Sequence, residues 1–102
     1  MSDTTLDLDT MRDAATEVAG LLRTLGNADR LLLLCQLTEG EFCVSELEAC
    51  TGISQPTLSQ QLGVLRNMAL VDTRREGKNI YYRIADARAL ALLQTVHDLY
   101  CD

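Results

Sequence analysis

The chain contains a single histidine, His97, and this scarcity argues against most catalytic and metal sites that rely on histidine. An enzyme needs a nucleophile beside a base, or a comparable set of converging groups, and no such pair is evident in these 102 residues. The six glycines do not build a Gly-rich phosphate loop. We therefore expect no enzyme and no cofactor.

Long apolar runs and a leader-like beginning are also missing. No run of about 18 apolar residues occurs, and the first residues, MSDTTLDLD, are acidic and polar. We expect neither a transmembrane helix nor a signal peptide, and we place the protein in the cytoplasm with no membrane partner. Repeats, low-complexity stretches and linkers are absent, so residues 1–102 are predicted to form one domain with 47% hydrophobic residues and a packed core.

Basic residues are scarce, nine against fifteen acids, but they are unevenly distributed. Residues 54–84 hold five cations and two acids, a local charge of +3, whereas residues 1–53 carry a net −7 and residues 85–102 a net −2. An acidic body with one basic edge favours a single docking orientation on a polyanion, because phosphate repels every other face. This basic segment is where we expect nucleic acid to bind.

The basic segment begins with a predicted helix whose two faces differ. Leu58, Leu62 and Leu65 recur at helical spacing and form a face that can dock on a core. The opposite face carries amides and hydroxyls, which bond base edges without the cost of desolvating a full charge. A solvated surface helix would have the same composition, but the basic hairpin that follows, around a Glu76–Asn79 turn, favours a DNA reader. The predicted contacts to double-stranded operator DNA are Ser54, Gln55, Thr57, Ser59, Gln60, Gln61, Arg66, Arg74, Arg75, Lys78 and Asn79.

Capping and breaking residues divide the chain into five helices and one hairpin. Asn27 is expected to cap the second helix and Gly40 to end it, Gly52 ends the third, and Ser54 caps the fourth with Pro56 in its first turn. The expected elements are helices 11–25, 28–37, 43–51, 54–66 and 86–100 and strands 70–75 and 80–84. The third and fourth helices then form a helix-turn-helix, with the fourth as the recognition helix, and the strands form a two-stranded wing. The fold class is a mainly α winged helix-turn-helix.

The first and last helices carry more apolar surface than one small domain needs to cover. The first has Met11, Val18 and Leu22 on one side, and the last has Leu92 and Val96. We therefore predict N- and C-terminal dimerisation helices and a homodimer. Two recognition helices would then address two half-sites about one helical turn apart.

Several separated segments, taken in order, resemble one protein family. Over residues 12–101 the chain is similar to the ArsR family of dimeric winged-helix repressors. It looks most like the family's sulfide-responsive and biofilm-growth-associated repressors, which are thiol sensors, and its HlyU-type relatives are nearer than the metal sensors. The matching segments are LGNADRLLLLCQLTEGE, GEFCVSELE, ISQPTLSQQLGVLR, TRREGKNIYYRI and the terminal LYC.

The metal sites of that family cannot be completed in this chain. Arsenic and cadmium sensors of the family carry a Cys-x-Cys pair where this sequence has Cys43 and Ser45, and zinc and nickel sensors carry Asp-x-His where it has Asp86 and Arg88. Thiolate and imidazole sites need three or four correctly placed ligands, so we expect no family metal site. The alternative function is a metal- or metalloid-responsive repressor that uses Cys43, Cys50 and Cys101 in an unfamiliar arrangement.

Four cysteines remain to be explained, and a reducing cytoplasm argues against a structural disulfide framework. By its position in RLLLLCQL, Cys35 can be an ordinary buried thiol. The family resemblance instead implies that Cys35 and Cys101 are the redox pair, brought together near the dimer interface, with reactive sulfur species as the effector. Cys101 is our first choice for the initial attack and Cys35 for resolution, while Cys43 and Cys50 are expected to be packing residues.

Overall fold

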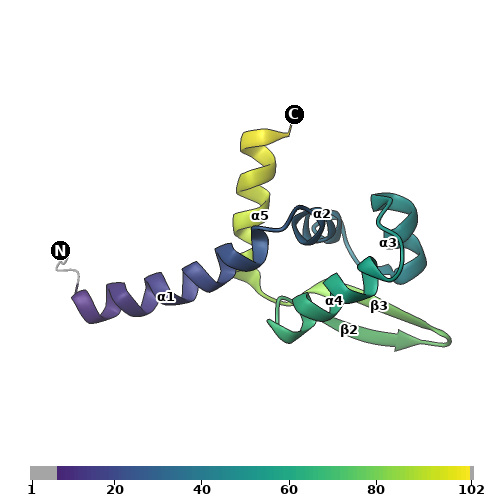
Figure 1. Cartoon of the computed structure of the whole chain (residues 1–102), viewed down its shortest axis with the longest axis horizontal. Helices are drawn as coiled ribbons and strands as arrows, with labels where there is room; N and C mark the ends of the chain where they lie inside the picture. Colours follow the sequence, from purple (N-terminus) through teal and green to yellow (C-terminus); the bar gives the residue numbers. More distant parts are fainter. Residues whose placement is uncertain (1–6, 102) are drawn as a thin grey trace.

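Five helices and a small antiparallel sheet make up the computed structural model, which describes residues 7–101 (Figure 1). The elements in chain order are α1 (Leu8–Leu25), α2 (Ala28–Leu37), β1 (Phe42–Cys43), α3 (Val44–Thr51), α4 (Thr57–Asn67), β2 (Val71–Glu76), β3 (Asn79–Ile84) and α5 (Ala87–Tyr100). The predicted helices and hairpin are all present, with bounds shifted by a few residues. No helix among the described residues is both long enough and apolar enough to cross a membrane.

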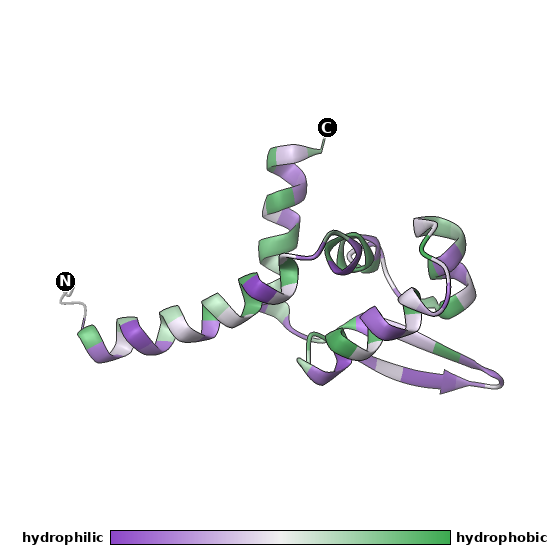
Figure 2. Ribbon diagram, in the orientation of Figure 1, coloured by the Kyte–Doolittle hydropathy of each residue, from purple (hydrophilic) through white to green (hydrophobic). Residues whose placement is uncertain are grey.

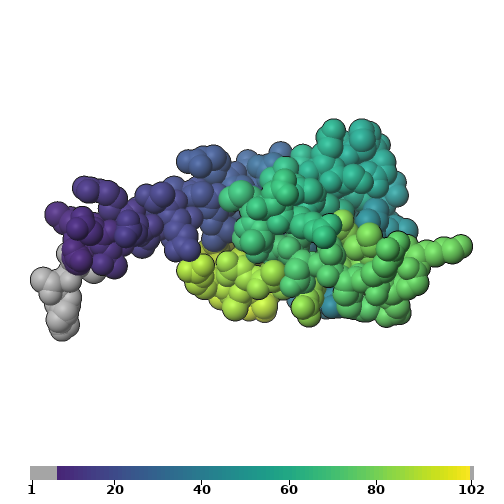
Figure 3. All heavy atoms as spheres, turned by 90° about the horizontal axis from the view of Figure 1, so that it is seen from below, coloured from purple at the N-terminus to yellow at the C-terminus, as the bar shows by residue number. Residues whose placement is uncertain are grey.

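Helix α1 projects from the rest of the molecule as an arm (Figures 1 and 3). It begins three residues earlier than expected because the Asp7 side chain accepts a hydrogen bond from the Asp9 N–H at 3.2 Å and caps the first turn. Residues 8–19 are exposed, and only Thr24 and Leu25 at the far end are buried. Since most helical stability in proteins comes from packing an apolar face, such an arm calls for a partner surface outside its own chain.

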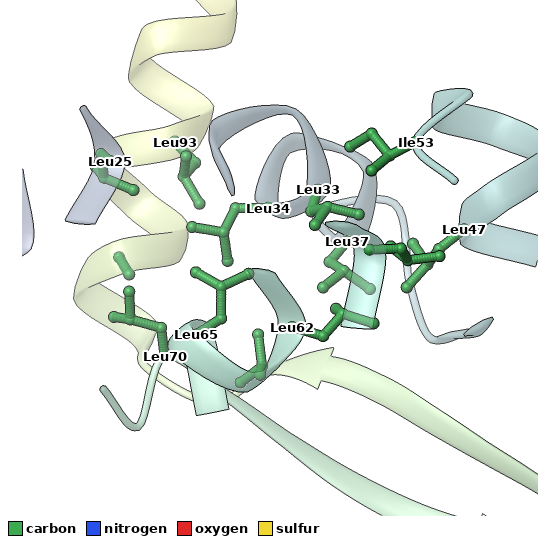
Figure 4. Packing of buried hydrophobic residues seen from close by; sticks show 13 residues of the cluster. Leu25, Leu33, Leu34, Leu37, Leu47, Ile53, Leu62, Leu65, Leu70 and Leu93 are labelled. Atoms are coloured by element: carbon green, nitrogen blue, oxygen red, sulfur yellow. The ribbon is translucent and has the colours of Figure 1, made fainter. Parts of the chain in front are cut away.

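The core is a cluster of leucines collected from α1, α2, α3, α4 and α5, with α2 at its centre (Figure 4). The largest fully buried side chains are Leu33, Leu34, Leu47, Leu58, Leu62, Leu65 and Leu93. The near-continuous apolar run of α2 is explained by this central position, because neighbours cover it on several sides. Asn27 caps α2 as predicted, with its side chain accepting from the Arg30 N–H at 3.0 Å.

A short third strand is present that the sequence did not predict. Phe42 and Cys43 form β1, which pairs with Tyr82 and Tyr81 of β3, so the sheet order is β1-β3-β2. Two residues are too short for strand periodicity to appear, and only the long-range pairing defines this element. Cys43, expected inside the third helix, is therefore the N-cap of α3, and its N–H donates to Glu46 Oε1 at 2.9 Å.

The turn between α3 and α4 differs from the prediction in one detail. Gly52 ends α3 in a left-handed conformation (φ 76°) as expected, because glycine adopts this region without steric cost. The expected Ser54 cap is wrong: α4 begins at Thr57 with Pro56 at the N-cap and no capping side chain. Pro56 lacks an N–H and its restricted φ suits the entry of a helix. The first turn is held by the backbone bonds from Leu58 to Ser54 and from Gln60 to Pro56, together with the Gln55 side chain.

Candidate DNA interface and thiol pair

Helix α4 lies across the core with one face buried and one face open. Leu58, Leu62 and Leu65 are buried against the leucine cluster, as their spacing predicted. The opposite face is exposed and includes Ser59 and Gln60. All of the predicted DNA contacts are exposed except Thr57 and Gln61, which are half-buried. The helix therefore presents amides and hydroxyls to the outside, the groups that base edges in a major groove require.

Two of the glutamines of this segment already have partners within the chain. The Gln55 side chain accepts a hydrogen bond from the Ser59 N–H at 3.1 Å, which satisfies one of the amides in the first turn of α4. Gln61 Oε1 accepts from Nη1 of Arg30 at 3.0 Å. Of the three glutamines predicted as contacts, Gln60 is the one whose side chain has no hydrogen-bond partner among the described residues.

The wing is a hairpin whose cations fall into two groups. Strands β2 and β3 pair from Val71↔Ile84 to Glu76↔Asn79, and Gly77 adopts a left-handed φ of 62° in the turn. Most of the hairpin's outer half is hydrophilic (Figure 2), and its end protrudes from the molecule opposite the arm (Figure 3). Arg75 and Lys78 are exposed and have no salt bridge to any residue that the structure describes.

Arg74, in contrast, is held by its own neighbours. Its guanidinium lies 2.7 Å from Glu41 Oε1 and 2.6 Å from Glu76 Oε1, and it sits over the Tyr81 ring at 4.7 Å. Hydrogen bonds to Glu76 and Glu41 raise the pKa of Arg74 above its ordinary value. Two carboxylates therefore neutralise this cation locally, although it remains exposed to solvent.

All four cysteines are thiols, and they occupy different environments. Cys35 is half-buried in α2, Cys101 is exposed just after α5, Cys43 is buried and Cys50 is exposed. The expectation that Cys50 is a packing residue is wrong, because α3 turns it to solvent, whereas Cys43 is part of the interior as expected. The described residues contain no group of three or more His, Cys, Asp or Glu side chains placed to hold a metal ion, so Cys43, Cys50 and Cys101 do not form a site within one chain.

Cys35 and Cys101 come from helices that lie side by side. The end of α2 and the last turns of α5 line a shared cavity of about 130 Å³ through Thr38, Glu39, Gln94, His97 and Asp98. The Thr38 hydroxyl donates to the Cys35 carbonyl at 2.6 Å, and the Cys101 N–H donates to the His97 carbonyl at 2.8 Å. The cavity is therefore lined by residues one helical turn along the chain from each cysteine, and neither cysteine lines it. Burial, and secondarily the Cys101 thiolate, raise the pKa of Cys35. The two sulfurs are thus within electrostatic range of each other although 66 residues separate them.

The comparisons with known proteins agree with this geometry. Residues 27–73 match the family described as bacterial regulatory protein, arsR family. A biofilm growth-associated repressor of Agrobacterium fabrum is 53% identical over 96 residues, which are 94% of this chain and 82% of that protein. The chain belongs to the arsR family.

Two solved structures extend the likeness to the fold. The crystal structure of the transcriptional repressor BigR from Xylella fastidiosa has a TM-score of 0.87 and 49% identity, covering 95% of this chain and 99% of that chain. The homodimeric winged helix-turn-helix DNA-binding domain Mb0332 from Mycobacterium bovis has a TM-score of 0.70 and 37% identity, covering 89% of this chain and 87% of that one. The predicted winged helix-turn-helix fold is confirmed, and so is the prediction that the chain is a transcriptional regulator and no enzyme.

Sequence reasoning missed one residue that contacts this site. Arg30 lies at the start of α2, far along the chain from α4, and nothing in the local pattern connects it with Gln61. Arg30 bonds Thr24 at the end of α1 and Gln61 on α4, and these contacts exist only once the helices are packed together.

Proposed function

We propose that this transcriptional repressor of the arsR family is a cytoplasmic homodimer that binds operator DNA while its thiols are reduced. Reactive sulfur species join Cys35 to Cys101, and the DNA is released. The observation that carries the proposal is the packing of α2 against α5, which brings the half-buried Cys35 and the exposed Cys101 within electrostatic range of each other. A bridge between these helices would shift the dimer geometry and hence the spacing of the two recognition helices.

The proposed dimer is supported by apolar surface that one chain leaves open. Leu8 is 70% exposed, Leu99 is 73% exposed and Tyr100 is 84% exposed, all on the two helices that project from the body. Met11 and Leu22 lie exposed along the same arm. Apolar surface of this extent is typical of an interface, and the homodimeric relative from Mycobacterium bovis has the same fold.

The proposed bridge can be written as a balanced reaction. The Cys101 thiolate takes a sulfane sulfur from an organic persulfide, releasing the organic thiol, and the resulting persulfide takes a second sulfur in the same way. The Cys35 thiolate then attacks the middle sulfur of this chain and expels hydrosulfide, leaving a trisulfide. The organic persulfide is the oxidant, and its thiol and the hydrosulfide carry away the electrons and protons. We assign the first attack to Cys101 because it is exposed, whereas Cys35 is half-buried and its pKa is raised by burial and by the neighbouring Cys101.

The proposed reaction can be tested directly on the wild-type protein by analysing the product of persulfide treatment. Treatment with an organic persulfide should yield a monomeric chain with added sulfur and two fewer hydrogens, and peptide mapping should find Cys35 and Cys101 in one cross-linked fragment. Peroxide should be less effective if the two thiols are held slightly too far apart, because a direct disulfide requires Cα atoms within about 7 Å and an added sulfur relaxes that limit. Recovery of unlinked Cys35 and Cys101 from protein that has released its operator would refute the mechanism.

The proposed DNA contacts are the exposed face of α4 and the wing, and the ion pairs of Arg74 support a larger role for Arg75. Arg75→Ala should weaken binding to any sequence and flatten the dependence of affinity on salt by about one phosphate contact. Arg74→Ala should leave the salt dependence nearly unchanged, because Glu41 and Glu76 already neutralise that guanidinium. Fluorescence anisotropy titrations over a series of salt concentrations measure both slopes, and an equal change in the two variants would contradict the ranking.

A further inference from the structure

Arg30 connects three helices through its side chain. Its Nε–H donates to the carbonyl of Thr24 at 2.7 Å, and its Nη1 donates to Gln61 Oε1 at 3.0 Å. Thr24 is in the last turn of α1, Arg30 is in the first turn of α2, and Gln61 is in the middle of α4. The side chain thus bonds the arm, the central helix and the recognition helix at one point.

The two hydrogen bonds of the Arg30 side chain hold the three helices in a fixed arrangement. The last carbonyls of a helix have no partner within the helix, so the Thr24 carbonyl is available to accept from outside α1. A planar guanidinium holds its donors at fixed angles, and hydrogen bonds from a charged donor are stronger than neutral ones. Arg30 and Gln61 are both half-buried, which limits competition from water.

We propose that Arg30 is a positioning residue for operator binding, and that Gln61 acts through Arg30 rather than on a base. This inference rests on the proposed function, because the angle between α1 and α4 matters when α1 joins two subunits and each α4 reads one half-site. Arg30 sets that angle in each subunit. The distance between the two recognition helices of the dimer is then already fixed in the DNA-free protein. This reduces the conformational entropy that is lost when the protein binds DNA.

Gln60 and Gln61 provide a matched pair for testing this assignment. They are adjacent on α4, but Gln60 is exposed and Gln61 is directed toward α2 by its bond to Arg30. A carboxylate at position 61 would keep an acceptor for the guanidinium. At position 60 it would place a negative charge on the open face, where phosphate and base acceptors repel it.

The experiment uses a duplex that the wild-type protein enriches from a randomised DNA pool, together with a duplex holding one of its half-sites. Gln61→Glu should retain operator affinity within about threefold, while Gln60→Glu should lose at least about tenfold. Gln61→Leu, which removes the acceptor, should lose about tenfold on the paired half-sites and less than about threefold on the single half-site. Thermal unfolding of each variant separates these effects from loss of fold.

A double-mutant cycle tests the pair itself. Adding Gln61→Leu to an Arg30→Met variant should weaken operator binding no further than Arg30→Met alone, because the bond is already absent. If Arg30→Met does not fold, the three Gln variants still decide the matter. Equal losses for Gln61→Glu and Gln60→Glu, or full operator affinity in Gln61→Leu, would overturn the inference while leaving the proposed function standing. Failure of the wild type to enrich any duplex would overturn both.

Discussion

Replacing Cys35 or Cys101 by serine is expected to leave operator binding intact and to abolish its release by organic persulfide. Serine is nearly isosteric with cysteine but cannot form a sulfur bridge, so each variant keeps the fold and loses the switch. In the wild type, persulfide should lower operator affinity on the order of 10- to 100-fold, the usual range for coupling between two sites. In either variant the change should stay below about twofold. Anisotropy titrations of reduced and persulfide-treated protein measure both values.

The exposed Cys50 offers a matched control for this switch. It is accessible to the same reagent but lies on α3 rather than on either helix of the proposed pair, so a Cys50→Ser variant should respond like the wild type. Release of DNA by the Cys35→Ser or the Cys101→Ser variant would rule out the bridge. Release caused by stoichiometric metal in untreated wild type would favour the metal-responsive alternative instead.

Shortening a buried side chain of the recognition helix α4 should have the largest effect on the free energy of unfolding. Leu65 is 0% exposed and packs in the leucine cluster, so Leu65→Ala removes buried methyl groups and leaves a cavity. The expected cost is about 2–5 kcal/mol of unfolding free energy. Because a small domain has only about 5–15 kcal/mol in total, the unfolding midpoint should fall steeply. Urea unfolding followed by far-UV circular dichroism, at fixed protein concentration, measures the loss.

The neighbouring residue provides the comparison for that loss. Val64 is 37% exposed on the same helix, and Val64→Ala should change the unfolding free energy by no more than about 0.5 kcal/mol. Similar costs for the two variants would mean that α4 does not dock by the leucine face, and the orientation of its polar face would then be wrong as well.

Most of the fold could be predicted because its signals are local. Leu58, Leu62 and Leu65 lie within one helix, and their spacing alone identifies the buried side of α4. Asn27 and Gly52 mark helix ends by their own backbone and side-chain preferences. The predicted Ser54 cap was wrong because Pro56 itself occupies the N-cap position of α4. Strand β1 was missed because two residues are too few to show an alternating pattern.

The candidate site could be predicted only in part. The polar composition of α4 and the basic wing were readable, and the pairing of Cys35 with Cys101 came from family resemblance, since nothing in their spacing connects them. The sequence could not predict which arginine forms ion pairs. Arg74 and Arg75 are adjacent and identical, yet only Arg74 lies between two carboxylates. Glu41 is 33 residues from Arg74, so the neutralised cation could not be distinguished from its neighbour in the sequence.

The amino-acid sequence by itself determined the order of helices, the wing, the buried leucine face of α4 and the concentration of positive charge in residues 54–84. These follow from periodicity, capping and composition, which act over a few neighbouring residues. Only the tertiary structure decided that Gln61 meets Arg30, that Cys50 faces solvent and that α2 and α5 bring two thiols within range. The physical reason is that such contacts depend on how helices pack, and packing is set by the whole core rather than by any one segment.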